Sequence, residues 1–389
     1  MSILVISFDA VGDKVFEAMA KDSGKYPNIA RFKKDAFYKG AVKTVFVTNT
    51  YPIHTTVSTG ALPKEHGIIS NFLPPKKNGE RPWAQMAKHI KGKTIWQAAR
   101  EKKLSTAAFL WPVTCGAKID YHIPEVHIEK GQNLLFRSLL YGSVFFQIAS
   151  IFRHGKKLIK AIKGMEYGGQ PELDDFTVSA ACDLFKQKKC DLALVHLIAY
   201  DSLYHFKGSG TEDLDIAKKS LDTNLGRLLD CWSGSVIIFS DHSQLDVNQN
   251  INLQEIYGNA VFEQAGGSAF FYSAPDSRSP ALKEQPWFER YLSKKEMEES
   301  GYSVKSTFGI AAKTGYIFTD SNKYKGAHGY PADYENYNVF YCVKGSSHGG
   351  PSQRQAAYEQ VRLKNHITDV TKIIIKELNL DMPDVHDII

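Results

Sequence analysis

The sequence predicts an α/β protein with a mostly parallel central sheet and helices on both faces. Several short runs are almost continuously apolar, which is typical of strands buried on both sides. Longer segments with helical periodicity alternate with them, as in a doubly wound fold. The 389 residues, 43% of them apolar, suffice for one large core, so we expect residues 1–389 to form a single catalytic domain.

The predicted elements follow one another in strand–helix order. The apolar runs expected to form strands are 3–9, 106–112, 191–201 and 235–241. Helical patterns lie between them at 27–36, 93–103, 174–189 and 215–232. The C-terminal part adds strand signals at 266–274, 315–320 and 338–345 and a last helix within 360–380.

Residues of about 127–170 interrupt this alternation and predict a helical cap inserted into the domain. The apolar run from Leu134 to Phe152 approaches the length of a membrane span, but Arg137 and Gln147 interrupt it. We therefore expect no transmembrane span. The basic residues that follow leave open an alternative, contact of segment 133–163 with a membrane surface.

Composition excludes several classes of protein. The net charge of +6 is too small to predict a stable nucleic-acid partner, although it suits an anionic substrate. The five cysteines form no CxxC pair, which argues against a disulfide framework or a cysteine zinc site. The start, MSILVISFDA, reads as a buried strand and not as a signal peptide, which predicts a cytoplasmic protein.

Acidic and imidazole side chains occur at or just after the ends of the predicted strands. They are Asp9, Asp201 with His205, the pair Asp241–His242, and His328 in a glycine-flanked turn. Ligands of open α/β sheets bind beyond the carboxyl ends of the strands, so these residues can converge. Mixed carboxylate and imidazole ligands suit two divalent metals. Taken singly, each residue has an ordinary explanation as a helix cap, a surface pair or a turn residue.

A candidate nucleophile lies in the segment NTYPIHTT. Thr50 precedes Pro52 and a helix-compatible run, so Thr50 is expected to be the N-cap of a helix. The free N–H groups and the dipole at a helix start also stabilise an alkoxide or a phosphate. A structural role and a catalytic role are therefore compatible at this position.

The order of these motifs resembles the nucleotide pyrophosphatase/phosphodiesterase family of the alkaline phosphatase superfamily. The matching segments are SFDAVG, NTYPIHTTVSTGALPKEHGI, YDSLYH, SDHS and GAHGY, and the likeness extends over residues 3–345. The resemblance implies an alkaline phosphatase-like fold with two metal ions, Zn²⁺ as the first choice and Mn²⁺ as the alternative. One metal would be held by Asp201, His205 and His328, and the other by Asp9, Asp241 and His242.

The resemblance also implies roles for three further residues. Thr50 would be the nucleophile, and Asn71 would donate to a non-bridging phosphoryl oxygen. Tyr51 would stack on a nucleobase, with packing at the pocket rim as the alternative. His348, in SSHGG, is expected to be a loop residue or a substrate contact.

The expected function is metal-dependent hydrolysis of phosphodiester or nucleotide pyrophosphate bonds through a phosphothreonine intermediate. The substrate would be a small phosphate diester or a nucleotide. Two alternatives keep the same site, a phosphonoacetate-type hydrolase and a phosphomonoesterase. A third, from another class, is a non-catalytic module that binds a membrane surface.

Overall fold

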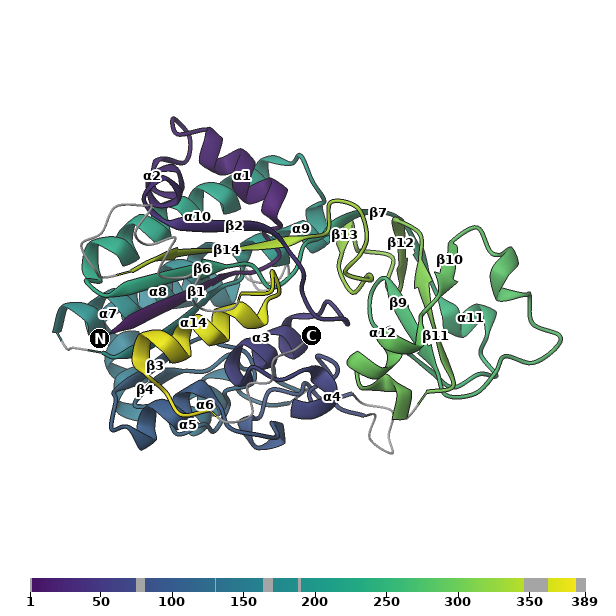
Figure 1. Ribbon diagram of the computed structural model, residues 1–389, viewed down its shortest axis with the longest axis horizontal. Coiled ribbons are helices and arrows are strands. Elements are labelled where there is room, and N and C mark those ends of the chain that lie inside the picture. Colours follow the sequence, from purple (N-terminus) through teal and green to yellow (C-terminus); the bar gives the residue numbers. More distant parts are fainter. Residues whose placement is uncertain are drawn as a thin grey trace.

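The computed structural model describes residues 2–74, 81–129, 131–163, 171–187, 190–304, 306–345 and 363–382. His348 and the start of the predicted last helix lie outside these residues. The described chain forms a large α/β body and a smaller, mainly β lobe, which lies at the right of Figure 1.

Seven strands form the central sheet of the large body. Their order is β2 (Phe37–Val42), β14 (Val339–Lys344), β6 (Ser235–Phe239), β1 (Ile3–Phe8), β5 (Leu192–Leu197), β3 (Thr106–Phe109) and β4 (Tyr121–Ile123). The run from β6 to β4 is parallel, whereas β14 is antiparallel to both β6 and β2. The sheet is therefore mixed, and the predicted α/β class is confirmed.

Helices cover both faces because alternate strand residues enter two separate cores. Leu4 and Ile6 of β1 pack with α1 (Asp13–Lys21), α2 (Pro27–Asp35), α8 (Pro171–Gln187) and α10 (Glu212–Cys231). Ile3 and Val5 pack on the other face with α3 (Thr50–Thr59), α5 (Ile95–Glu101) and α14 (Thr368–Leu378). This two-sided burial explains why the strands read as continuous apolar runs.

The smaller lobe occupies residues 245–337 and was not predicted from the sequence. Its three-stranded sheet contains β12 (Gly315–Phe318), β7 (Leu245–Ile251) and β13 (Gly326–Ala327). Its four-stranded sheet contains β10 (Phe288–Tyr291), β11 (Phe308–Ala312), β9 (Ser268–Phe271) and β8 (Phe262–Gln264). The lobe has its own core around Tyr257, Trp287 and Tyr330. Two strands expected near 266–274 and 315–320 thus belong to this lobe and not to the central sheet.

The insertion expected near 127–170 contains two helices, α6 (Leu134–Tyr141) and α7 (Val144–Lys163). Helix α7 packs along α8 and against β4, at the edge of the central sheet. Among the described residues, no helix is long and apolar enough to cross a membrane.

One predicted strand ends earlier than expected. Strand β5 stops at Leu197, and the chain turns into α9 (Ala199–Lys207). Two backbone N–H groups at this turn, those of Ile198 and Ala199, donate to the buried carboxylate of Asp174 on α8. Asp201 and His205 therefore lie on a helix, where a spacing of four residues places them on one face.

Candidate active site

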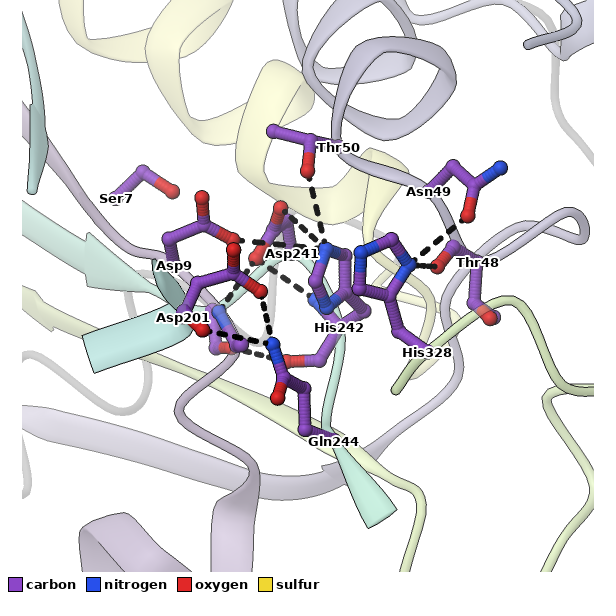
Figure 2. Close-up of polar contacts among 12 residues, drawn as sticks. Ser7, Asp9, Thr48, Asn49, Thr50, Asp201, Asp241, His242, Gln244 and His328 are labelled. Atoms are coloured by element: carbon purple, nitrogen blue, oxygen red, sulfur yellow. Dashed lines mark hydrogen bonds and ion pairs between the residues drawn. The ribbon is translucent and has the colours of Figure 1, made fainter. Parts of the chain in front are cut away.

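The residues singled out from the sequence converge at the carboxyl end of the central sheet. Asp9 follows β1 directly, and Asp241 and His242 follow β6 by two and three residues. Asp201 and His205 come from α9, and His328 follows β13 of the smaller lobe. Figure 2 shows Asp9, Asp201, Asp241, His242 and His328 turned toward one another below the hydroxyl of Thr50. Segments that lie more than 300 positions apart in the chain thus meet at one place.

Two groups of side chains have ligand atoms close enough to hold a metal ion. Asp9, Asp241 and His242 form one group, and Asp201, His242 and His328 form the other, with ligand atoms within 4.8 Å of one another in each. His242 belongs to both. His205, which the resemblance implied as a ligand, lies beside the second group, with its Nε2 3.4 Å from Asp201 Oδ1.

Hydrogen bonds at Nδ1 orient the three imidazoles. The Nδ1 atoms of His205, His242 and His328 lie 2.9, 3.3 and 3.1 Å from the backbone carbonyl oxygens of Gly326, Ser243 and Thr48. An Nδ1–H that donates to a carbonyl leaves Nε2 as the free lone pair, as in most metal-binding histidines. Burial lowers the pKa of His242 to about 4 and that of His328 well below its usual value. Both rings are therefore neutral at pH 7, the state that binds metals.

The carboxylates of Asp9 and Asp241 each have one oxygen with a hydrogen-bond partner and one without, and the latter oxygens lie 3.5 and 3.3 Å from Nε2 of His242. Asp9 Oδ2 lies 3.1 Å from Nε2 of His196, and Asp241 Oδ1 accepts hydrogen bonds from the backbone N–H groups of Ala10 and His242. Asp9 Oδ1 and Asp241 Oδ2 are buried and have no hydrogen-bond partner.

Unpaired buried carboxylate oxygens are costly unless a cation meets them. Burial, together with the charge of Asp241, raises the pKa of Asp9, and burial raises that of Asp241 to about 6. Two such oxygens beside neutral imidazoles fit the donor set of a divalent metal.

Thr50 lies at the start of α3, one position later than expected. Asn49, in an extended conformation, is the N-cap, and Thr50 is the first helical residue. The prediction that Thr50 is the cap was therefore wrong by one residue, a shift within the usual uncertainty of helix ends. The Thr50 Oγ1 atom lies 3.2 Å from His242 Nε2. The hydroxyl thus contacts the imidazole that both ligand groups share.

Asn71 and Tyr51 lie beside Thr50 on the cavity wall. Asn71 Oδ1 accepts a hydrogen bond of 2.9 Å from the backbone N–H of Tyr51, which fixes the amide and leaves its NH₂ group available. The Tyr51 side chain is only 1% exposed and packs against Trp83. This burial favours the packing alternative for Tyr51 over nucleobase stacking.

Several functional neighbours were missed from the sequence. His196 on β5 contacts Asp9, and Gln244 donates to Asp201 through its side-chain amide. The side chain of Asn49 contacts His328 Nδ1 at 2.9 Å. Of these residues, only His196 could be suspected from the sequence, because an imidazole inside an otherwise apolar strand needs a buried hydrogen-bond partner.

The site opens into a cavity of about 1130 Å³. One end contains Asp9, Thr50, Asp201, His205 and His328. Half-buried aromatic residues, Phe72 and Trp83, form part of the wall near Asn71. Apolar side chains of α6, α7 and α8 also line the cavity, as do polar side chains of the smaller lobe such as Gln254 and Asp320. The volume exceeds that of a typical small-ligand site.

Solved structures of related shape support the fold. Mouse ectonucleotide pyrophosphatase/phosphodiesterase 5 matches with a TM-score of 0.66 at 16% identity, covering 99% of this chain and 97% of that one. An inactive threonine-to-alanine variant of the same mouse protein, in complex with AMP, matches with a TM-score of 0.65 at the same identity and coverage.

Sequence comparison adds more local matches. Human ectonucleotide pyrophosphatase/phosphodiesterase family member 1 is 34% identical over 94 residues, which span 23% of this chain and 10% of the human protein. Bovine bis(5'-adenosyl)-triphosphatase ENPP4 is 33% identical over 149 residues, which span 36% of this chain and 30% of the bovine protein. The model of one family, type I phosphodiesterase/nucleotide pyrophosphatase, matches residues 3–331. This chain therefore belongs to the type I phosphodiesterase/nucleotide pyrophosphatase family.

Proposed function

We propose that this chain hydrolyses phosphodiester or nucleotide pyrophosphate bonds, with Thr50 as the nucleophile and two divalent metal ions as cofactors. The observation that supports this most is the position of Thr50 Oγ1, 3.2 Å from the imidazole that both ligand groups share. A hydroxyl that only stabilised the helix would not need to contact an imidazole shared by two candidate metal groups.

The metal ions would be held by two sets of side chains. Asp9, Asp241 and His242 form the first set, and Asp201, His205 and His328 the second. Zn²⁺ is the first candidate and Mn²⁺ the alternative, because both accept mixed oxygen and imidazole ligands. When bound, such ions lower the pKa of a nearby hydroxyl and offset the negative charge that develops on phosphoryl and leaving oxygens.

The side chains of this protein then perform the bond changes. Thr50 Oγ1 releases its proton to solvent and attacks phosphorus in line, which breaks the bond to the leaving oxygen and gives a phosphothreonine; the leaving oxygen takes up a proton from solvent. The N-terminal N–H groups of α3 face the negative charge that forms at this position. The Asn71 amide donates its N–H to a non-bridging oxygen, since its own oxygen is bound to the Tyr51 N–H. Water then attacks phosphorus and breaks the bond to Thr50 Oγ1, and a proton from the water restores the Thr50 hydroxyl.

A nucleotide is a reasonable substrate for this geometry. The mouse neighbour in complex with AMP is an inactive threonine-to-alanine variant, and ENPP4 is named a bis(5'-adenosyl)-triphosphatase. In this chain Phe72 and Trp83 present half-buried ring surfaces to the cavity close to Asn71. The cavity also leaves room for the second substituent of a diester, which a monoesterase does not need.

Rates on three substrates test the proposal. We expect the metal-loaded protein to hydrolyse bis-p-nitrophenyl phosphate faster than p-nitrophenyl phosphate or phosphonoacetate. A strong preference for the monoester would reject the phosphodiesterase in favour of a phosphomonoesterase, and a preference for phosphonoacetate would favour a phosphonate hydrolase. Assays with and without a chelator establish that the turnover depends on metal.

A further inference from the structure

Two cysteines that are distant in the sequence meet between helices α8 and α10. Cys182 comes from the second half of α8, and Cys231 is the last residue of α10. Their sulfur atoms are 2.9 Å apart, although 49 positions separate the two residues in the chain. Both are free thiols in this structure. A disulfide bond is about 2.05 Å long, so the two sulfur atoms need to approach by only about 0.9 Å to bond.

Contacts on both sides of this pair hold the two helices in register. One helical turn earlier, the guanidinium of Arg227 on α10 donates a hydrogen bond of 2.6 Å to Ser179 Oγ on α8. One turn beyond Cys182, the ring of Phe185 packs edge to face against Trp232, with the ring centroids 4.8 Å apart. These contacts fix the backbone around the cysteines without involving sulfur. The two thiols are therefore kept close before any covalent bond joins them.

The two thiols of the pair differ in charge. The S–H group of Cys231 donates to the sulfur of Cys182, and this hydrogen bond, with the positive charges of Arg227 and Lys186, lowers the pKa of Cys182. The same hydrogen bond raises the pKa of Cys231. Cys182 is therefore the sulfur that becomes a thiolate first. Oxidants react with thiolates, and most readily where a second cysteine lies beside the first.

The other three cysteines have a different environment. Cys115, Cys190 and Cys342 are buried, and burial raises the pKa of all three thiols, to about 12 for Cys115 and Cys190. The sulfur atoms of Cys115 and Cys190 hydrogen-bond to backbone carbonyl oxygens and not to another sulfur. These cysteines provide internal controls for the reactivity of the pair.

We propose that Cys182 and Cys231 form an oxidation-sensitive dithiol, which a peroxide converts into a disulfide that links α8 to α10. The proposal goes beyond the hydrolysis proposed above and does not depend on it. It adds a site of reversible thiol modification, on the face of the central sheet that α8 and α10 cover.

The oxidation balances with hydrogen peroxide as the oxidant. The Cys182 thiolate attacks one peroxide oxygen, which breaks the O–O bond and gives a sulfenic acid and hydroxide. The Cys231 thiolate then attacks the sulfur of the sulfenic acid, which breaks the S–O bond and releases a second hydroxide. The protons lost by the two thiols convert both hydroxides to water. Two electrons thus pass from the sulfur atoms to the peroxide, and a dithiol reductant reverses the change by thiol–disulfide exchange.

The cross-link acts on stability and not on the reacting groups. Cys231 lies four residues before Ser235, where β6 begins, whereas Asp241 follows the other end of that strand. The pair is therefore at the edge of the sheet opposite the candidate active site. A disulfide here closes a loop between residues 49 positions apart, which restricts the unfolded chain and so favours the folded one.

Counting thiols tests the cross-link. The native protein has five cysteines. Titration of the denatured protein with a thiol-reactive dye should show a loss of two thiols after treatment with hydrogen peroxide, and their return after dithiothreitol. Mass spectrometry of a non-reduced digest should find the peptides of Cys182 and Cys231 joined. Retention of all thiols, a sulfinic acid at Cys182 without a cross-link, or a disulfide between two copies of the chain would overturn the proposal.

Variants identify the thiols that react. Cys231→Ser should not lose two thiols, because Cys182 has no partner left. Cys190→Ala is the matched control: it removes a buried thiol outside the pair and should still lose two. A loss of two thiols in Cys231→Ser would assign the disulfide to other cysteines and reject the pair. Circular dichroism establishes that each variant is folded, and Cys182→Ser serves as a second variant of the pair.

Thermal unfolding tests the effect of the cross-link on the fold. The oxidised native protein should have a Tm about 5 °C higher than the reduced protein, because the closed loop lowers the entropy of the unfolded chain. This difference should vanish in Cys231→Ser and persist in Cys190→Ala. Equal Tm values for the oxidised and reduced native protein would show that the disulfide does not stabilise the fold and would overturn that role. Neither measurement involves turnover, so a negative result leaves the proposed hydrolysis untouched.

Discussion

The hydroxyl oxygen of Thr50 lies 3.2 Å from Nε2 of His242, an imidazole that belongs to both groups of candidate metal ligands. Thr50 comes from the first turn of α3 and His242 from the loop after β6, so the contact joins a helix start to the edge of the sheet. Because α3 packs on the sheet through Ile53 and Val57, the contact is fixed by the core and not by a mobile loop.

The contact predicts a specific result for Thr50→Ala. Under the proposed mechanism, removing the Thr50 hydroxyl should lower kcat on bis-p-nitrophenyl phosphate by roughly 10³-fold or more, because the proposed phosphothreonine can no longer form. Metal content, measured by elemental analysis, should stay unchanged, since the carboxylates and imidazoles remain. Thr50→Ser is the matched control and should keep part of the activity. Turnover that survives in the alanine variant would remove Thr50 from its role.

His196 predicts an effect transmitted through Asp9. Its Nε2 lies 3.1 Å from Asp9 Oδ2, while its Nδ1 lies 3.0 Å from the carbonyl oxygen of Leu110, so the ring holds the carboxylate in one orientation. His196→Ala should weaken metal binding about 10- to 100-fold, the usual effect of losing a partner of a ligand. Competition with a chelating dye measures this affinity.

His196→Gln is the matched control, because glutamine retains an N–H donor for Asp9. It should bind metal more tightly than His196→Ala. Equal losses in the two variants would show that packing of the ring against His54, at a centroid distance of 4.5 Å, is what matters.

Some parts of this site could be predicted from the sequence for a physical reason. Asp9 and the pair Asp241–His242 interrupt or follow fully apolar runs, and a sheet buried on both faces places such residues at its edge. The position of Asp201 on a helix was harder to predict, because the run 191–201 is apolar enough to be interpreted as one strand. The break after Leu197 depends on the hydrogen bonds to Asp174, a contact between segments distant in sequence.

Other features depend on pairing that a single sequence does not encode. An apolar run such as Val339–Lys344 has the same pattern in a parallel or an antiparallel neighbour, so the reversed direction of β14 was not predictable. In the lobe at 245–337, strands β7, β8 and β10 are only partly buried, and they lack the long apolar runs of the central strands. The resemblance implied His328 as a ligand, but that this residue comes from a separate lobe follows only from the tertiary structure.

A side chain at Gly329 is expected to displace the neighbouring His328. The φ of +84° at Gly329 favours glycine, and a Cβ at this position would collide with the backbone carbonyl of Ala265. Gly329→Ala should therefore lower the free energy of unfolding by about 2–4 kcal/mol, as expected for backbone strain combined with a clash. It should also reduce metal content, because His328 precedes the displaced residue. Urea unfolding and elemental analysis measure the two effects.

The variant Gly92→Ala separates the energetic effect of backbone strain from that of a steric collision. Gly92 has the same φ of +84°, but a Cβ there meets nothing within 4 Å. Gly92→Ala should lower the free energy of unfolding by only about 1 kcal/mol and leave the metal content unchanged. Similar losses for the two variants would mean that the contact between Gly329 and Ala265 contributes little.

Asp174 predicts how stability depends on pH. Burial raises the pKa of this carboxyl to about 7 in the folded protein, from a usual value of 3.8. Between these two values the folded state holds a proton that the unfolded state has lost. The stabilisation that Asp174 contributes to the folded state is therefore complete below about pH 4 and is lost as the pH rises to about 7. The free energy of unfolding should therefore gain less from rising pH in the native protein than in a variant without this carboxyl.

Asp174→Asn is the variant that isolates this carboxyl, and urea unfolding at a series of pH values measures the difference between the two proteins. The two N–H groups of Ile198 and Ala199 donate to different carboxylate oxygens, so the amide introduced by the substitution keeps an acceptor for one of them, where α9 begins. The variant should therefore fold and still carry Asp201 and His205 on that helix. Parallel pH profiles for the two proteins would show that Asp174 is ionised throughout this range, held in that state by the two N–H donors.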